Sequence, residues 1–226
     1  MDTNVKLLDR FRWPLRSSGI FKGLKDAELV SILRNCRPQE AAFNEDDILW
    51  TQDDPFVDLF ILRSGRLICY RNTISCKDQL VCYYDPGQPI ALEGVLSHKH
   101  TSPFTIKSSM EGSYVSLSFK QILKSDKLHR DVRETILLNL AKVVADDSIR
   151  NMNKACVLAR YKSQDRIIAF LELVGSRSKG DFFDVGMDRQ EMANYLSVDR
   201  TTLSTELNKL QRAGTIEMQG RNFRLL

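Results

Sequence analysis

Residues 188–210, DRQEMANYLSVDRTTLSTELNKL, decide the fold of the C-terminal part of the chain. Their beginning is typical of a helix N-terminus, because Asp188 can accept hydrogen bonds from free backbone amides and Glu191, three residues later, completes a capping box. An inward apolar face follows at Met192, Ala193 and Leu196. After a two-residue turn, Asp199 can cap a second helix. The stretch therefore predicts two short helices joined by a tight turn.

The second of these helices has two faces of different chemistry. Leu203, Leu207 and Leu210 recur at i, i+4 and i+7 and are expected to point inward. The opposite face carries hydrogen-bonding side chains and no acidic one, at Arg200, Thr201, Ser204, Thr205 and Asn208. This pattern favours a helix-turn-helix whose second helix enters the major groove of DNA with its N-terminal residues against the base edges. The alternative is a helical hairpin that makes protein contacts only.

The DNA contacts expected of single side chains follow from their positions. Arg200, at the helix start, is placed for a bidentate contact to guanine O6 and N7, and Thr201 and Thr205 are expected to read neighbouring bases. Phosphate contacts, which fix register without reading sequence, are expected from Arg189, Gln190, Thr202, Ser204 and Arg221. The last of these residues lies in a predicted β-hairpin, in which segments 216–218 and 223–225 flank QGRN at 219–222. Such a hairpin with a basic tip has the form of a wing.

The N-terminal half follows other periodicities. The first 37 residues are predicted to be helical. From residue 38 to 118, short apolar segments alternate with turn residues: LFIL at 59–62 precedes Ser64-Gly65, and LICY at 67–70 and LVCYY at 80–84 follow. Strands of this length and spacing predict an antiparallel sandwich or roll.

A second helical region follows residue 119. It carries two neighbouring apolar stripes, one at Ile136, Leu140 and Val143 and one at Leu137, Ala141 and Val144. A helix that is apolar over so wide an arc must bury two faces, and the second face is most simply covered by the same helix of another copy. The alternative is a core helix of a monomer. Asp146-Asp147 breaks the stripe, so an uninterrupted leucine-type zipper is not supported.

Composition excludes several classes of protein. The chain has 226 residues, a formal net charge of +4 and 42% hydrophobic residues, which is an ordinary globular balance that allows a polyanionic partner. We expect no secretory signal, no membrane span and a cytoplasmic protein. Five cysteines without a C-x-x-C pair disfavour a disulfide framework or a zinc site. With three histidines and no nucleophile elbow, Walker loop or H-E-x-x-H motif, we expect no enzyme, no metal and no cofactor.

The order of these elements resembles the cyclic-AMP receptor protein/FNR superfamily of bacterial transcription regulators, from residue 20 to residue 226. Similar motifs are IFKGL at 20–24, LFILRSGRL at 59–67, which resembles the family's central hairpin, and RQEMA at 189–193, which resembles its first DNA-binding helix. The resemblance implies an α+β fold with four parts: an extension (1–19), an effector-sensing, cyclic-nucleotide-binding-like β-roll (20–127), a long central dimerisation helix (128–158) and a winged helix-turn-helix (159–226).

The function that the resemblance implies is a homodimeric, sequence-specific DNA-binding transcription regulator. Its partners would be double-stranded DNA with a palindromic operator, a second copy of the chain and RNA polymerase, with no membrane. Thr201 stands where many members have Glu, and Thr205 where the founding type has a second Arg, so the operator is expected to depart from the founding consensus. The alternative is a ligand-binding regulatory module without DNA-binding activity.

The sequence departs from the family pattern in the effector pocket. Where cyclic-nucleotide-binding members carry a phosphate-binding Arg, this chain has Ser102-Pro103. Because a buried cyclic phosphate needs a fixed cation or a cluster of amides, we predict that cyclic AMP is not the effector. The residues expected to line the pocket are Glu93, Thr101, Ser102 and Asn151. Cys69, Cys76 and Cys82 lie on one run of strand and turn that can bring two of them together, and the sequence leaves open whether any is a redox switch.

Overall fold

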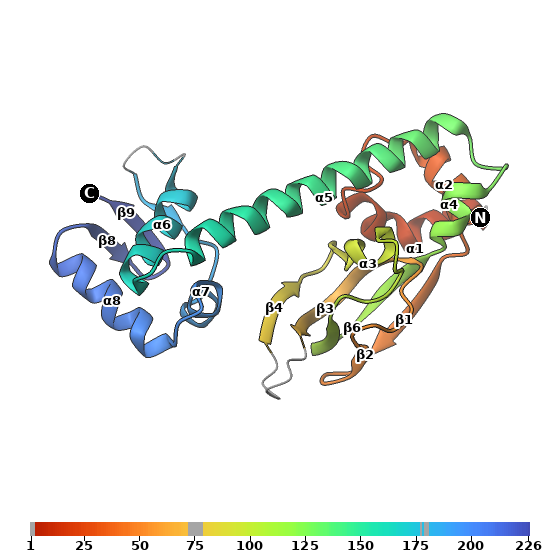
Figure 1. Ribbon diagram of the computed structural model, residues 1–226. Helices are drawn as coiled ribbons and strands as arrows, with labels where there is room; N and C mark the ends of the chain where they lie inside the picture. The colour runs from red at the N-terminus through yellow and green to blue at the C-terminus, as the bar shows by residue number, and fades with distance from the viewer. Residues whose placement is uncertain (1–2, 72–78, 177, 179–180) are drawn as a thin grey trace. The chain divides into compact units, whose positions relative to one another are not determined.

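A computed structural model describes residues 3–71, 79–176, 178 and 181–226 (Figure 1). The chain divides into two compact units, Met1–Ala145 and Asp146–Leu226. Within the described residues, no helix is both long and apolar enough to cross a membrane. The domain boundaries expected from the sequence, at residues 20, 128 and 159, stay predictions, because the division into units falls inside a helix.

The first unit is built on an antiparallel sheet whose main strand order is β1-β6-β3-β4, with β2 paired to β6 and β5 paired to β3. The strands are β1 (Gln39–Phe43), β2 (Ile48–Trp50), β3 (Leu59–Arg71), β4 (Gln79–Tyr84), β5 (Pro89–Ile90) and β6 (Thr105–Leu117). The helices wholly within this unit are α1 (Thr3–Ser17), α2 (Asp26–Asn35), α3 (Leu92–Leu96) and α4 (Phe119–Lys124). Together with the elements described below, this architecture confirms the predicted α+β fold class.

One expectation about the sheet is wrong. Segments 59–62 and 67–70 were expected to be separate strands of a central hairpin with a turn at Ser64-Gly65, but they form the single strand β3. This strand pairs with β6 from Leu59 to Tyr70, with register shifts between Leu62 and Leu67. Gly65 has φ +82°, a conformation that favours glycine, so the turn signal marks an irregularity inside a long strand rather than a chain reversal.

The long helix α5 (Arg130–Leu158) begins in the first unit. Its residues Ile136 and Leu140 are buried in the hydrophobic core of that unit, as the first predicted stripe requires. Between them Asn139 is also buried, and its Nδ2 donates hydrogen bonds to the backbone carbonyls of Ile20 at 3.0 Å and Lys22 at 2.8 Å. The amide therefore ties the helix to the segment at residues 20–22.

Apolar side chains also occupy the solvent-exposed side of α5. Leu138, Ile149 and Met152 are 57%, 56% and 64% exposed. Helical spacing puts them on one face with two smaller exposed residues, Ala145 and Cys156. We call these five residues the α5 seam. They lie about half a turn from Ile136 and Leu140, so the two apolar faces of the helix point in opposite directions.

The second unit packs three helices against a small sheet. After the end of α5 come α6 (Ser163–Gly175), α7 (Arg189–Leu196) and α8 (Arg200–Arg212). The sheet has the order β7-β9-β8, with β7 (Phe183–Asp184), β8 (Ile216–Gln219) and β9 (Asn222–Leu225). Its core contains fully or almost fully buried side chains from all three helices and from β9, including Phe170, Met192, Leu203, Leu207 and Phe223.

Candidate nucleic-acid interface

The two helices α7 and α8 begin at the predicted caps. Asp188 accepts hydrogen bonds from the backbone amides of Gln190 at 2.7 Å and Glu191 at 2.8 Å, and the Glu191 carboxylate accepts from the Asp188 amide at 2.9 Å. This reciprocal pair is the predicted capping box. Asp199 caps α8 by accepting from the Thr202 amide at 2.7 Å. Both predicted helix starts are therefore confirmed.

The turn between the helices is short because one residue takes a left-handed conformation. Ser197 has φ 53° and ψ 47°, and the next amide, that of Val198, donates to the carbonyl of Ala193 at 3.0 Å. Ala193 is fully buried, so its small side chain lets the two helices approach. This geometry is the helix-turn-helix that the sequence predicts.

The two faces of α8 separate as expected. Leu203, Leu207 and Leu210 are at most 1% exposed, whereas the opposite face is open to solvent at Arg200, Thr201, Ser204, Thr205 and Asn208. The Arg200 guanidinium makes no hydrogen bond or ion pair to any residue that the structure describes. The start of α8 therefore presents a guanidinium that has no partner among the described residues, on the same face as the exposed residues Thr201, Ser204 and Thr205.

Two residues predicted to contact phosphates, Thr202 and Ser204, already donate their hydroxyl hydrogen bonds to other groups of the protein. The Thr202 hydroxyl donates to the second carboxylate oxygen of Asp199, and this hydrogen bond is the main reason why the pKa of Asp199 lies below its ordinary value. The Ser204 hydroxyl donates to the Arg200 carbonyl at 2.8 Å. Because a phosphate oxygen only accepts hydrogen bonds, either hydroxyl must leave its present partner to reach one.

Arg189 has a different environment from the other predicted phosphate ligands. Its guanidinium donates to the carbonyl of Gly220 at 2.9 Å and lies over the ring of Phe223, 5.0 Å from the centroid. Burial lowers its pKa. The side chain therefore connects the start of α7 to the turn between β8 and β9. The sequence alone does not predict that Arg189 fixes the β8–β9 turn to α7, because this contact depends on where the hairpin packs.

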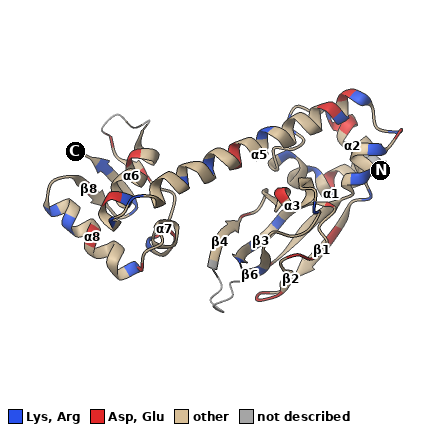
Figure 2. Ribbon diagram, viewed as in Figure 1, with Lys and Arg blue, Asp and Glu red and all other residues tan. Residues whose placement is uncertain are grey.

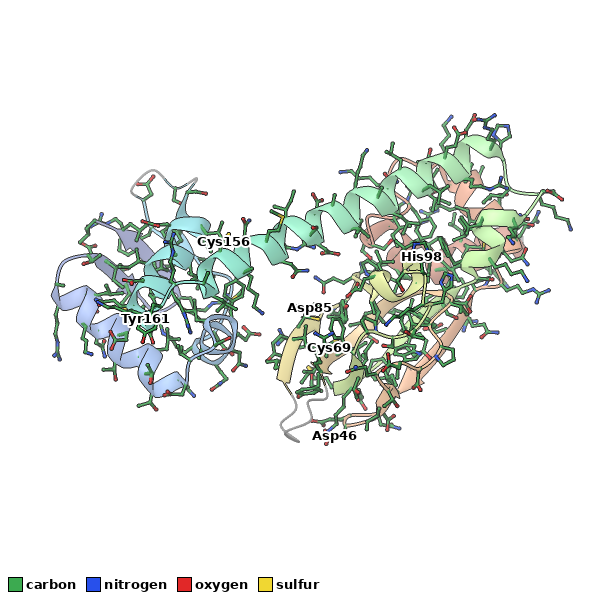
Figure 3. The ribbon with its side chains drawn as sticks, in the orientation of Figure 1. Asp46, Cys69, Asp85, His98, Cys156 and Tyr161 are labelled. Atoms are coloured by element: carbon green, nitrogen blue, oxygen red, sulfur yellow. The ribbon has the colours of Figure 1, made fainter. Side chains whose placement is uncertain are left out.

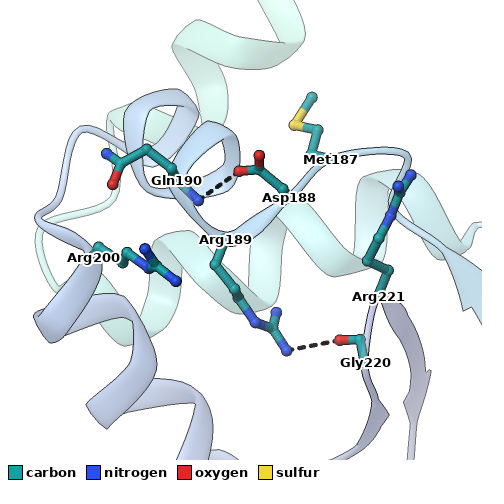
Figure 4. Close-up of a pocket in the computed structure, with 7 residues that line it drawn as sticks. All are labelled: Met187, Asp188, Arg189, Gln190, Arg200, Gly220 and Arg221. Atoms are coloured by element: carbon teal, nitrogen blue, oxygen red, sulfur yellow. Dashed lines mark hydrogen bonds between the residues drawn. The ribbon is translucent and has the colours of Figure 1, made fainter.

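That turn is the predicted wing. β8 and β9 pair with Gln219 opposite Asn222, which leaves Gly220 and Arg221 as a two-residue turn. Gly220 has φ +61°, and Arg221 is 58% exposed, with Asp184 3.5 Å away. A cavity of about 440 Å³ lies between the starts of α7 and α8 and this turn (Figure 4). It is lined by Met187, Asp188, Arg189, Gln190, Arg200, Gly220 and Arg221.

The charge of the surface around α8 depends on where its basic and acidic side chains lie more than on how many there are. Figure 2 shows basic residues at both ends of α8, and these are Arg200 at the start and Lys209 and Arg212 in the last turn. The acidic Glu206 is paired with Lys209 at 2.7 Å. Three arginines and one aspartate line the cavity beside the helix start. This cavity can attract a polyanion.

The residues predicted to line an effector pocket differ in burial and lie on different parts of the chain. Ser102 is fully buried, and its hydroxyl donates to the carbonyl of Phe104 at 2.7 Å, so this group shapes its own loop. Thr101 forms an isolated β-bridge with Pro55. Glu93 is exposed on α3, and Asn151 is exposed on the part of α5 in the second unit. Their roles as effector ligands stay predictions.

No group of three or more histidine, cysteine or acidic residues that could hold a metal ion occurs within the described ranges. Sequence reasoning also missed the α5 seam, because Ile149 and Met152 lie beyond Asp146-Asp147, which interrupts the predicted apolar stripes. The signal was present as 4-3-4-3-4 spacing from Leu138 through Lys142 and Ala145 to Cys156.

Comparison with known proteins gives matches over most of the chain. Residues 165–226 match the Crp-like helix-turn-helix domain. The transcriptional activator protein anr of Pseudomonas aeruginosa is 23% identical over 203 residues, which is 88% of this chain and 79% of that protein. Among solved structures, a CooA mutant from Carboxydothermus hydrogenoformans superposes with a TM-score of 0.62 at 19% identity, over 100% of this chain and 92% of that one. The c-di-GMP-responsive global regulator CLP of Xanthomonas campestris gives 0.61 at 18% identity, over 89% and 99%.

Proposed function

We propose that the chain is a regulator of the CRP/FNR superfamily that acts as a homodimer and binds a palindromic DNA operator with sequence specificity. The proposal is supported by the match of residues 165–226 to the Crp-like helix-turn-helix domain and by the similarity to a transcriptional activator over most of the chain. In this proposal the DNA partner places the protein in the cytoplasm. A signal received by the first unit controls operator affinity. RNA polymerase is the further partner through which such a regulator acts.

The observation that carries the proposal is the exposed, uncommitted guanidinium of Arg200 at the start of α8. This guanidinium stands at the head of a solvent-exposed face that carries small hydroxyl and amide side chains and no acidic one. In the major groove the same guanidinium can donate two hydrogen bonds to one guanine. Thr201 and Thr205, one and five residues further along the helix, are exposed on the same face and are the proposed readers of the neighbouring base pairs.

The proposed phosphate-binding residues fall into three groups: those already exposed, those that must first rotate, and one that mainly positions the wing. Arg221 at the wing tip and Gln190 at the start of α7 are exposed and line the cavity beside Arg200. Thr202 and Ser204 can join them after their hydroxyls rotate. Arg189 keeps the wing in place through Gly220, so we assign its main contribution to positioning the wing and only secondarily to direct phosphate binding.

The α5 seam supports the homodimer. Exposed apolar residues gathered on one face of a helix are costly in a monomer, and this seam, interrupted by Lys142, has the spacing of roughly 3.5 residues by which parallel helices pair. A two-fold axis along the seam brings two copies of the same surface together. Two recognition helices then address half-sites about 34–36 Å apart.

The signal itself is proposed to be something other than cyclic AMP, because the expected phosphate-binding cation is replaced by Ser102 and Pro103. A change in the first unit is proposed to act through residues 156–162, between the end of α5 and the start of α6, by shifting the population of DNA-binding-competent dimers. Calorimetric titration with cyclic AMP is expected to show no specific binding. Tight, specific binding would overturn this part of the proposal.

Selection of bound sites from random duplex DNA, followed by gel-shift titration at two salt concentrations, tests the function. We expect one palindromic consensus, and an affinity that falls steeply with salt, since bound phosphates release counterions. Arg200→Ala is expected to cost about 1–3 kcal/mol, roughly 5- to 150-fold in affinity, and to relax selectivity at one base pair per half-site.

Arg212→Ala is the matched control, because Arg212 is an exposed arginine in the last turn of the same helix. It is expected to leave base selectivity unchanged. The proposal fails if the wild-type protein selects no sequence, or if Arg200→Ala binds the selected operator as tightly and selectively as the wild type. Failure of selection would favour the alternative, a regulatory module without DNA-binding activity.

A further inference from the structure

Two cysteines face each other across neighbouring strands of the first unit. Cys69 in β3 and Cys82 in β4 are Cα partners in the antiparallel register, and both are free thiols (Figure 3 labels Cys69). The Cα atoms of such partners lie about 4.5–5.5 Å apart, and a disulfide spans about 4.4–6.8 Å. The backbone therefore already holds these two residues at a separation that a disulfide accepts.

Their side chains also interact. The Cys69 thiol is hydrogen-bonded to Cys82, and this bond, followed by burial, raises the pKa of Cys69 far above its ordinary value. As direct Cα partners in the antiparallel register, Cys69 and Cys82 project their side chains from the same face of the sheet.

The two thiols differ in access to solvent. Cys69 is fully buried, whereas Cys82 is partly exposed at the edge of the hydrophobic core. The remaining described cysteines lack this arrangement: Cys36 is buried and Cys156 is exposed on α5. One accessible thiol backed by a buried second thiol is the arrangement that thiol–disulfide exchange needs, because the first is attacked from solvent and the second resolves the product.

We propose that Cys69 and Cys82 form a reversible dithiol–disulfide couple, a modification site in the first unit whose oxidant is a low-molecular-weight disulfide of the glutathione type. This proposal is independent of DNA binding. It assigns a chemical input to the unit in which the effector pocket was expected.

The reaction takes place in two exchanges. Cys82 loses its proton to solvent and its sulfur attacks one sulfur of the oxidant, forming a mixed disulfide and releasing one small thiolate, which takes up a proton. Cys69 then loses its proton and attacks the Cys82 sulfur, forming the protein disulfide and releasing the second small thiol. The two protein thiols give up two electrons, and the oxidant is reduced to two thiols.

The raised pKa of Cys69 does not block the second exchange. Its largest cause is the hydrogen bond to Cys82, and this interaction between the two thiols is lost once the Cys82 sulfur is part of the mixed disulfide. Burial still disfavours the Cys69 thiolate, so the second exchange is expected to be the slower one.

Redox titration of the full chain in buffers of oxidised and reduced glutathione tests the proposal. The protein is equilibrated at a series of ratios, quenched with acid, denatured and alkylated, and its modified thiols are counted by mass spectrometry. We expect the five alkylatable thiols of the reduced chain to fall to three on oxidation and to return on reduction. Digestion without reductant is expected to give one linked pair of peptides, containing Cys69 and Cys82.

The matched variants are Cys82→Ser, which is expected to abolish the loss of two thiols, and Cys36→Ser and Cys156→Ser, which are expected to retain it. The wild-type peptide map decides the question even if a variant fails to fold. The proposal is overturned if all five thiols stay alkylatable at every ratio. It is equally overturned if the linked peptides contain Cys76, which lies outside the described residues, or Cys156 in place of the proposed pair.

Discussion

Asn139 is a polar residue in the middle of an apolar helix face, and its contacts show why the position is polar. From sequence it reads as an interruption of the stretch from Ile136 to Ala145. In the structure its amide donates to the carbonyls of Ile20 and Lys22, far away in the chain. Single sequences carry no sign of such a pairing, because the partners are backbone atoms that any residue supplies.

Replacing this amide tests its contribution. Asn139→Leu keeps the branched shape of the side chain but leaves the two carbonyls without their donor, so we expect a loss of about 1–3 kcal/mol in the free energy of unfolding of the first unit. Both tryptophans, Trp13 and Trp50, lie in that unit, so urea unfolding followed by tryptophan fluorescence reports it selectively. Asn151→Leu is the control, since Asn151 is exposed on the same helix. Equal stability of the two variants would contradict the assigned role.

The carboxylate of Asp199 gives a prediction that depends on pH. Its pKa is lowered, first by the Thr202 hydroxyl and then by the Thr202 amide. A carboxyl whose folded pKa is depressed contributes stability above its unfolded pKa, near 4, and this contribution is lost as pH falls through the lower folded pKa. An NMR titration of the Asp199 carboxyl should therefore have its midpoint below the ordinary value. Thr202→Val should raise that midpoint, and an unchanged midpoint would mean that the hydroxyl is not the main cause.

At the scale of single elements, the sequence predicts the features that depend on residues close together in the chain. It does not predict those that depend on which strands pair. The caps at Asp188 and Asp199 and the buried leucines of α8 follow from residues within one helical turn of each other, and all are confirmed. Ser64-Gly65 shows the limit, because a strand irregularity and a hairpin turn both use a glycine at positive φ. Only the partner strand β6 distinguishes them.

The paired strands β3 and β6 approach each other closely near that glycine. A Cβ added to Gly112 would lie 2.1 Å from the Ser64 carbonyl oxygen and 2.8 Å from the Gly65 Cα. Because both obstacles are backbone atoms, the strands must separate to admit a methyl group. We expect Gly112→Ala to lower the free energy of unfolding by about 1–3 kcal/mol or more, measured by the same fluorescence method.

Glu111→Ala, at an exposed neighbouring position on β6, is the control for Gly112→Ala. We expect this change to stay within about 0.5 kcal/mol. If Gly112→Ala were as stable as the control, the close approach of the two strands would be wrong.

For the whole molecule, the sequence alone does not show which apolar face of α5 stays exposed to solvent after the chain has folded. Two apolar faces on the long helix were predicted, and a second copy was proposed to cover one of them. Leu137 and Ala141 of the second predicted stripe are exposed, but the most exposed large apolar side chains of α5 are Leu138, Ile149 and Met152. Exposure depends on the packing of the first stripe, which periodicity alone places only to within one residue.

The α5 seam can be tested without reference to DNA. Met152→Glu puts one carboxylate from each copy into the proposed interface and removes two buried methionine side chains, each worth about 1.5–3 kcal/mol. We therefore expect the dissociation constant of the dimer to rise by about 100-fold or more. Sedimentation equilibrium should show twice the 25.9 kDa chain mass for the wild type and a shift toward that mass for the variant.

Asn151→Glu adds the same charge one residue away, on a side of the helix that does not face the seam, so it should remain dimeric. Cys156 provides a second measurement, because a two-fold axis along the seam brings the Cys156 thiols of two copies close enough for a short bismaleimide to link them. Linked dimers should form in the wild type and in Asn151→Glu, and should be lost in Cys156→Ser and reduced in Met152→Glu. A wild-type protein that sediments as a single chain at micromolar concentration would leave the seam uncovered, and the paired reading of two half-sites would then have no structural basis.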